Sequence, residues 1–187
     1  MGTYEDYCEL IDHLSAEDAA KPDRKKHRLP MNCYAASDCE FFFTVCARHQ
    51  GMPFTNPDLA GAIVECLLWR KKHHGWMMFC YCLMPDHLHF ILKLSPHEAV
   101  PVNAGTRGQV LTGVLDQIAG FKSFTTTQIW WKQGRAGRLW QKSSYDRVIR
   151  HNDSIRHAAS YVLDNPVRKD LVKQWQDYHY SRIVDPW

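Results

Sequence analysis

Two histidines in the middle of the chain, His87 and His89, have the spacing of a metal-binding pair. Only Leu88 separates them, and alternate residues of a β-strand point to the same face of the sheet. Two imidazoles on one face can hold a divalent metal and leave other coordination positions for water, a phosphate oxygen or a further protein ligand. The alternative is a pair of polar side chains on a solvated sheet face.

A tyrosine and an asparagine four residues apart, Tyr161 and Asn165, form a second candidate site on a predicted helix. Projection of residues 153–165 at about 100° per residue gives one apolar stripe that would face the core. This stripe consists of Ile155, Ala159, Val162 and Leu163. Tyr161 and Asn165 fall together on the other side, where both could face one ligand. The alternative is an exposed tyrosine on a helix that ends at Asn165-Pro166.

The segment 130–150 combines basic and aromatic side chains. Its aromatic residues are Trp130, Trp131, Trp140 and Tyr145. Its basic residues, against the single acid Asp146, are Lys132, Arg135, Arg138, Lys142, Arg147 and Arg150. Phosphates bind Arg and Lys and unstacked bases bind rings, so the segment predicts contact with single-stranded or hairpin DNA. The alternative is a solvated loop anchored by tryptophans in the core, which is the interpretation we favour for Trp140.

The net charge of +3 conceals two parts with opposite charge. Residues 1–20 contain six acids and no Lys or Arg, whereas the remaining residues contain 23 bases and 14 acids. A basic body favours a polyanionic partner. No apolar run reaches the roughly 20 residues that span a bilayer, and the acidic first residues lack the basic region of a secretory signal.

The seven cysteines are odd in number and include no C-x-x-C pair, which favours reduced thiols in a cytoplasmic protein over a disulfide framework or a zinc ribbon. Cys80 and Cys82 fall in the most apolar stretch and are predicted to be core residues.

The elements that must position these residues alternate between strands and helices. Strands are predicted at 41–46, 76–84, 87–94 and 145–149, and helices at 57–74, 109–126 and 153–164. The order β-α-β-β-α-β is typical of the split βαβ, ferredoxin-like fold, an antiparallel α+β sheet with helices on one face. Residues 1–37 are predicted to be an N-terminal extension with an acidic leader and a basic patch, and residues 38–187 the folded domain that carries the candidate site residues.

Five blocks of the sequence resemble the Y1 transposases, the IS200-like and REP-associated tyrosine transposase family. Met84–His89 resembles the family's HUH motif. The other blocks occur in the family's order and are Phe42–Val45, Leu139–Gln141, Tyr145–Arg150 and Tyr161–Arg168. The resemblance covers about residues 38–172.

The resemblance implies a metal-dependent mechanism on single-stranded DNA. His87 and His89 would bind Mg²⁺ or Mn²⁺, and Asn165 would be a third ligand of the kind found in REP-associated members. Tyr161 would be the nucleophile that forms a 5′-phosphotyrosine, with Tyr145 as its rival. Residues that would contact DNA are Arg135, Arg138, Lys142, Arg147, Arg150 and Arg168.

The function expected from this resemblance is a DNA transposase, or single-strand endonuclease, that cleaves and rejoins hairpin-forming DNA as a monomer or a homodimer. One alternative is a nucleic-acid-binding module that no longer cleaves. Another is a histidine–metal hydrolase of a different type, which would leave the helix of Tyr161 unexplained.

Overall fold

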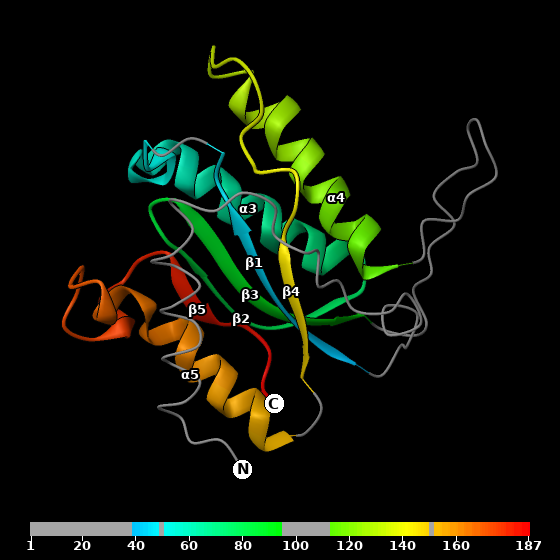
Figure 1. The fold of residues 1–187 in the computed structure, drawn as a ribbon, viewed down its shortest axis with the longest axis vertical. Coiled ribbons are helices and arrows are strands. Elements are labelled where there is room, and N and C mark those ends of the chain that lie inside the picture. The colour runs from blue at the N-terminus through cyan, green and yellow to red at the C-terminus, as the bar shows by residue number, and fades with distance from the viewer. Residues whose placement is uncertain (1–38, 49–50, 95–112, 150–151) are drawn as a thin grey trace, which may run out of the picture.

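The protein is described by a computed structural model of residues 39–48, 51–94, 113–149 and 152–187. These residues form one sheet of five antiparallel strands in the order β4-β1-β3-β2-β5 (Figure 1). The strands are β1 (Glu40–Cys46), β2 (Trp76–Leu83), β3 (His87–Leu94), β4 (Tyr145–Ile149) and β5 (Ser181–Ile183). The helices are α3 (Pro57–His73), α4 (Val114–Phe124) and α5 (Asn152–Arg168). The predicted extension 1–37, the start of the predicted helix 109–126 and Arg150 lie outside the described residues.

The predicted order of strands and helices is confirmed from β1 to α5. Helix α3 begins where Asn56 accepts a hydrogen bond from the Leu59 backbone at 2.9 Å, with Pro57 in the first turn. It ends before Gly75, whose φ of 63° is the left-handed conformation that favours glycine after a helix. No helix of the described residues is long and apolar enough to span a membrane.

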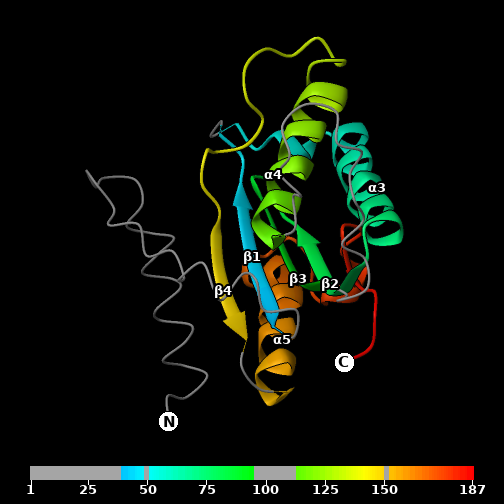
Figure 2. The same ribbon diagram turned by 90° about the vertical axis from the view of Figure 1, so that its right-hand side faces the viewer.

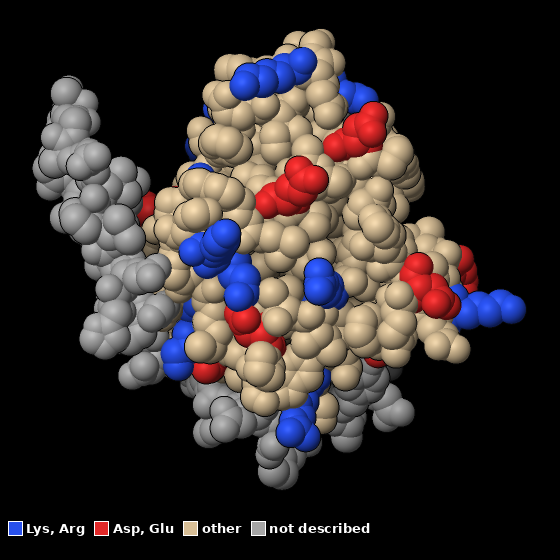
Figure 3. Space-filling model, turned by 180° about the vertical axis from the view of Figure 1, so that it is seen from behind, with Lys and Arg blue, Asp and Glu red and all other residues tan. Residues whose placement is uncertain are grey.

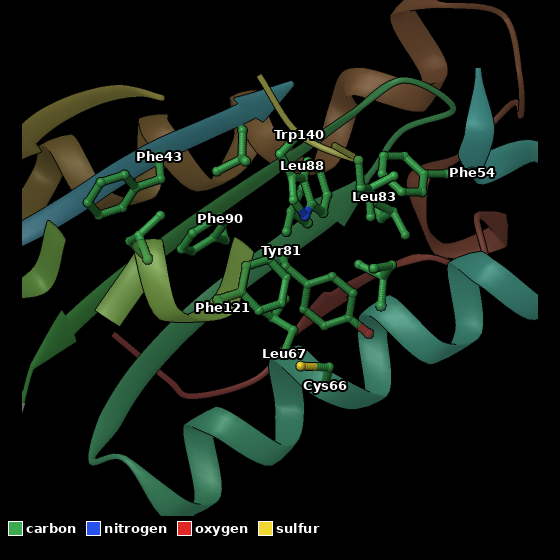
Figure 4. Packing of buried hydrophobic residues seen from close by; sticks show 14 of the residues in the cluster. Phe43, Phe54, Cys66, Leu67, Tyr81, Leu83, Leu88, Phe90, Phe121 and Trp140 are labelled. Atoms are coloured by element: carbon green, nitrogen blue, oxygen red, sulfur yellow. The ribbon is translucent and has the colours of Figure 1, made fainter. Parts of the chain in front are cut away.

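The sheet is covered on both faces. Helices α3 and α4 pack on one face, as expected, over a core that contains Phe43, Leu88 and Phe90 (Figure 4). Helix α5 packs on the opposite face, against a second cluster that contains Phe42 and Ile91, and lies apart from α3 and α4 in Figure 2. The side chains of β3 therefore alternate between the two faces of the sheet, as predicted. The face that carries His87 and His89 points toward α5 rather than into open solvent.

Strand β2 contains a β-bulge that the sequence did not predict. Met78 pairs with Leu92 and Cys80 pairs with Ile91, so Phe79 is an extra residue in the ladder. Phe79 and Cys80 both face α5 as a result. The prediction that Cys80 and Cys82 are core residues is confirmed, since both are fully buried.

Helix α4 continues beyond the predicted end at Thr126 as a π-helical segment, Thr125–Trp130. The hydroxyls of Thr125 and Thr126 each donate at 2.8 Å to a carbonyl four residues earlier. Thr125 also accepts from the indole of Trp140 at 2.8 Å. Trp140 is buried, so its interpretation as a core anchor is correct.

Helix α5 does not end at Asn165-Pro166, so this prediction was wrong. Pro166 instead lies inside the helix, where a proline removes one backbone hydrogen bond to the preceding turn but leaves the amides of the residues after it able to bond. The helix ends instead at Arg168, and Asp170, two residues later, adopts the left-handed φ of 53°. The Leu171 and Asp170 amides donate to Pro166 and Val167 carbonyls, the paired bonds of a Schellman cap.

Candidate functional site

The sheet face under α5 carries a row of side chains that begins at its β4 edge. Tyr145 pairs with Thr44, Thr44 pairs with His89, and His89 pairs with Cys82. Directly paired residues of antiparallel strands project to the same face. The pairing of the strands therefore brings Tyr145, Thr44 and His89 into one line, although they are far apart in the sequence.

The two histidines converge on one point, as their spacing predicted. Their Nε2 atoms are 2.9 Å apart. The Nδ1 atom of His87 lies 2.6 Å from a carboxylate oxygen of Asp86, and the Nδ1 atom of His89 lies 2.8 Å from the hydroxyl of Thr44. Metal-binding histidines usually have such a partner on the ring nitrogen that faces away from the metal.

The hydrogen bonds determine which nitrogens carry protons when both rings are neutral. The carboxylate of Asp86 can only accept, so His87 carries its proton on Nδ1. The Nε2 atom of His87 must then accept from Nε2–H of His89, and Nδ1 of His89 accepts from the Thr44 hydroxyl. If the two histidines held a metal through these nitrogens, His89 would carry its proton on Nδ1 instead. Because a hydroxyl can both donate and accept, Thr44 is a suitable partner in either state.

Burial keeps His89 neutral. Its exposed fraction is 5%, and burial, followed by the charges of His87 and Arg168, holds the pKa of His89 well below its usual value. The hydrogen bond to His87 is the main reason that the pKa of Asp86 is lowered. A neutral imidazole is the form that binds a metal. The donor set therefore fits a divalent cation, although no cluster of three or more His, Cys, Asp or Glu side chains in the described part of the chain would complete its coordination.

Tyr161 lies beside the histidine pair in the same chain. Its ring packs edge-on against His89, with centroids 5.8 Å apart, and edge-on against Phe42 at 6.0 Å. The guanidinium carbon of Arg168 lies 4.0 Å from the centre of the Tyr161 ring. The helical projection had placed Tyr161 away from the core, but the structure places it half-buried at the core margin, where it faces the sheet.

Asn165 is buried one turn after Tyr161, with an exposed fraction of 5%. Its side-chain amide donates to the Tyr161 carbonyl at 3.2 Å, a bond that stays within α5. The structure thus brings Tyr161 into contact with His89, whereas the hydrogen bond described for Asn165 does not reach the histidines.

The predicted DNA-contacting residues divide between the two faces of the sheet. Arg147 pairs with Phe42 on the face of the histidines, and Arg168 covers Tyr161 there. Arg138 and Lys142 line a groove of about 380 Å³ against α4, together with the exposed Trp131. Arg135 lies over the ring of Trp130. Seen from behind, basic and acidic side chains are interspersed and form no continuous basic patch (Figure 3).

Comparison with known proteins gives two curated relatives. The chain is 21% identical over 113 residues to a protein of Haemophilus influenzae assigned to the REP-associated tyrosine transposases, over 59% of this chain and 60% of that protein. It is 22% identical over 144 residues to the REP-associated tyrosine transposase of Escherichia coli, over 75% of this chain and 74% of that protein. The chain is therefore similar in sequence to REP-associated tyrosine transposases. No family model matches it.

The fold is also that of a REP-associated tyrosine transposase. A solved structure of such a protein bound to a REP hairpin matches with a TM-score of 0.60 and 21% identity, over 84% of this chain and 82% of the other. The resemblance expected from the five sequence blocks is thereby confirmed in sequence and in fold.

Within this transposase-like fold, sequence analysis missed two residues that support the site. Thr44 is the one polar residue in Phe41–Val45 and lies two residues after Phe42, a spacing that predicts a shared face. Phe42 stacks on His89 with ring centroids 5.5 Å apart and also contacts Tyr161 and Tyr145. Nothing in the local sequence indicates that one phenylalanine connects these three rings.

Proposed function

We propose that this protein cleaves and rejoins single-stranded, hairpin-forming DNA through a covalent intermediate on Tyr161. The observation that carries the proposal is the contact of Tyr161 with His89, whose Nε2 atom converges with that of His87 in the same chain. A nucleophile beside a pair of potential metal ligands is an arrangement suited to metal-assisted phosphoryl transfer.

The reaction assigned to Tyr161 is a transesterification. Its phenol oxygen attacks the scissile phosphorus and forms the new P–O bond of a 5′-phosphotyrosine. The bond to the 3′-oxygen breaks, and that oxygen leaves and takes up a proton as a free 3′-hydroxyl. Attack by another 3′-hydroxyl on the phosphotyrosine reverses the step and joins the DNA to a new end, so no external energy source is needed.

The side chains around Tyr161 would prepare it for attack. Phe42, His89 and Arg168 hold its ring on three sides, which lowers the cost of placing the hydroxyl. The guanidinium of Arg168 also places a positive charge beside the ring.

His87 and His89 would hold Mg²⁺ or Mn²⁺. When bound, the cation would polarise the scissile phosphate and neutralise charge that develops on it. Imidazole is a softer ligand than the oxygen donors that Mg²⁺ prefers, so the donor set favours Mn²⁺. The buried Asn165 amide is the protein group that we propose as a further ligand.

The substrate class is inferred from the relatives and from the basic side chains. The matched structure is bound to a REP hairpin, and Arg147 and Arg168 lie on the face of the proposed nucleophile. We assign these two residues to the cleaved strand, and Arg138 and Lys142 to the DNA that continues across the α4 face.

The test is to trap the covalent adduct. Labelled hairpin DNA with unpaired flanks is incubated with Mn²⁺ and protein, and adducts are separated on a denaturing gel. The wild-type protein should give an adduct that disappears in Tyr161→Phe and on chelation, whereas Tyr145→Phe should retain it. An equal yield from Tyr161→Phe and wild type would show that Tyr161 is not the nucleophile. Salt-sensitive binding without any adduct, unaffected by chelation, would identify a non-cleaving binding module instead.

A further inference from the structure

Tyr145 is an exposed aromatic residue at the edge of the candidate site. It is the first residue of β4, an edge strand of the sheet, and its exposed fraction is 47%. Stacking of unpaired nucleobases is a common use of exposed aromatic rings in proteins that bind single strands.

The position of Tyr145 relative to Tyr161 is fixed by Phe42. The Phe42 ring lies between the two tyrosines and contacts Tyr145 edge-on at 6.5 Å and Tyr161 edge-on at 6.0 Å. Because the contact is edge-on, Phe42 covers at most one face of the Tyr145 ring. Nearly half of the Tyr145 surface is exposed among the described residues, so a planar ligand could reach the ring one ring beyond the proposed nucleophile.

A cationic residue accompanies this ring. Arg147 follows two residues later on the same face of β4 and pairs with Phe42. An aromatic face beside a guanidinium combines the two contacts that a nucleotide uses, stacking for the base and charge for the phosphate.

We propose that Tyr145 and Arg147 form a subsite for one unpaired nucleotide that flanks the scissile phosphate. The base stacks on Tyr145, and Arg147 binds the adjoining phosphate. This inference rests on the proposed function, because it places the cleaved strand across Phe42 toward Tyr161. It also explains a second tyrosine near the histidines without a second nucleophile: Thr44 separates Tyr145 from His89 in the row, whereas Tyr161 contacts His89 directly.

The test measures binding without cleavage. In the Tyr161→Phe background, a tight-binding hairpin with unpaired flanks is selected from a randomised pool, and its affinity is measured for variants at position 145. Tyr145→Leu keeps an apolar side chain on Phe42 but removes the ring, so it should weaken binding by about 5- to 150-fold, the effect of losing one base stack. Tyr145→Phe should bind as tightly as the parent. Trp69→Leu, which removes an equally exposed ring on α3, is the matched control and should also leave affinity unchanged.

Abasic substitution identifies the nucleotide. Removal of one flanking base should weaken binding to the parent by the same factor as Tyr145→Leu, and the two changes together should add no further loss. The subsite would be overturned if Tyr145→Leu bound the hairpin as tightly as the parent. It would also be overturned if, at every abasic position, the loss of affinity multiplied with the loss caused by Tyr145→Leu. Either result would leave the proposed function intact. Loss of the covalent adduct in Tyr145→Phe would instead make Tyr145 the nucleophile, while failure to select any hairpin would overturn both proposals.

Discussion

At the scale of single residues, the hydrogen-bond partners of the two histidines differ in a way that suits the proposed metal binding. The carboxylate of Asp86 can only accept a hydrogen bond from His87, so it fixes that ring in one tautomer. Thr44 can donate to or accept from His89, so it accommodates the change of tautomer that metal binding demands. The His87 ring is therefore held in one tautomer, whereas the His89 ring can change its tautomer and keep its hydrogen bond to Thr44.

We expect Thr44→Val to lower affinity for Mn²⁺ by about 10- to 100-fold, the usual effect of removing a hydrogen-bond partner of a metal ligand. Valine has nearly the same shape, so packing on the sheet is retained, but it leaves Nδ1 of the buried His89 without a partner. Thr44→Ser keeps the hydroxyl and should bind like the wild type. The measurement is titration with Mn²⁺ followed calorimetrically, and equal affinity of Val and wild type would contradict the assigned role.

At the scale of elements, β2 lies between the two layers of helices and carries thiols that water does not reach. Burial raises the pKa of Cys82 to about 12 and that of Cys80 still higher, where the charge of Cys82 adds to the effect of burial. Thiols of the unfolded chain ionise near 9.0. Above that pH the unfolded state therefore releases protons that the folded state retains.

The resulting prediction is a loss of stability at alkaline pH. The contribution of each thiol is complete below pH 9 and falls as the pH rises toward the folded pKa, by about 1.4 kcal/mol per thiol between pH 8 and pH 10. The double variant Cys80→Ala/Cys82→Ala should be less stable at pH 8 because of the cavities left behind. Its free energy of unfolding in urea should nevertheless decrease less steeply with pH than that of the wild type. Parallel pH profiles would show that the thiols ionise equally in both states.

At the scale of the whole molecule, strand order and helix placement complete the candidate site within one chain. Strand β3 supplies the histidines, β1 supplies Thr44 and Phe42, and α5 crosses the same face to supply Tyr161. The opposite face is occupied by α3 and α4. This two-sided arrangement separates the proposed chemistry from the groove against α4.

A complementation experiment tests whether this single-chain site is the one that acts. Tyr161→Phe lacks the proposed nucleophile, and His87→Ala/His89→Ala lacks the proposed ligands. Co-expression lets the two inactive variants form mixed oligomers. If the site acts within one chain, the mixture should form no more adduct than either variant alone. Recovery of adduct would require Tyr161 of one chain to act with the histidines of another.

The sequence by itself determined the features that depend on local periodicity and local bonds. Alternation over residues 87–94 predicted the shared face of His87 and His89, and Asn56-Pro57 predicted the start of α3; both are confirmed. The ordered motifs predicted the resemblance to REP-associated tyrosine transposases, and the two curated relatives confirm that resemblance. These features could be predicted because each is set by neighbours within a few residues.

Only the tertiary structure decided how these segments meet. The sequence placed Tyr161 on the polar side of its helix, but its contact with His89 depends on which sheet face α5 covers. The sequence predicted that this helix ends at Asn165-Pro166, but the helix continues to Arg168 and is closed by the Schellman cap at Asp170. Arg168 is thereby placed over the tyrosine ring. Such contacts join residues that are distant in the chain, and their geometry follows from the packing of whole elements, which no local pattern contains.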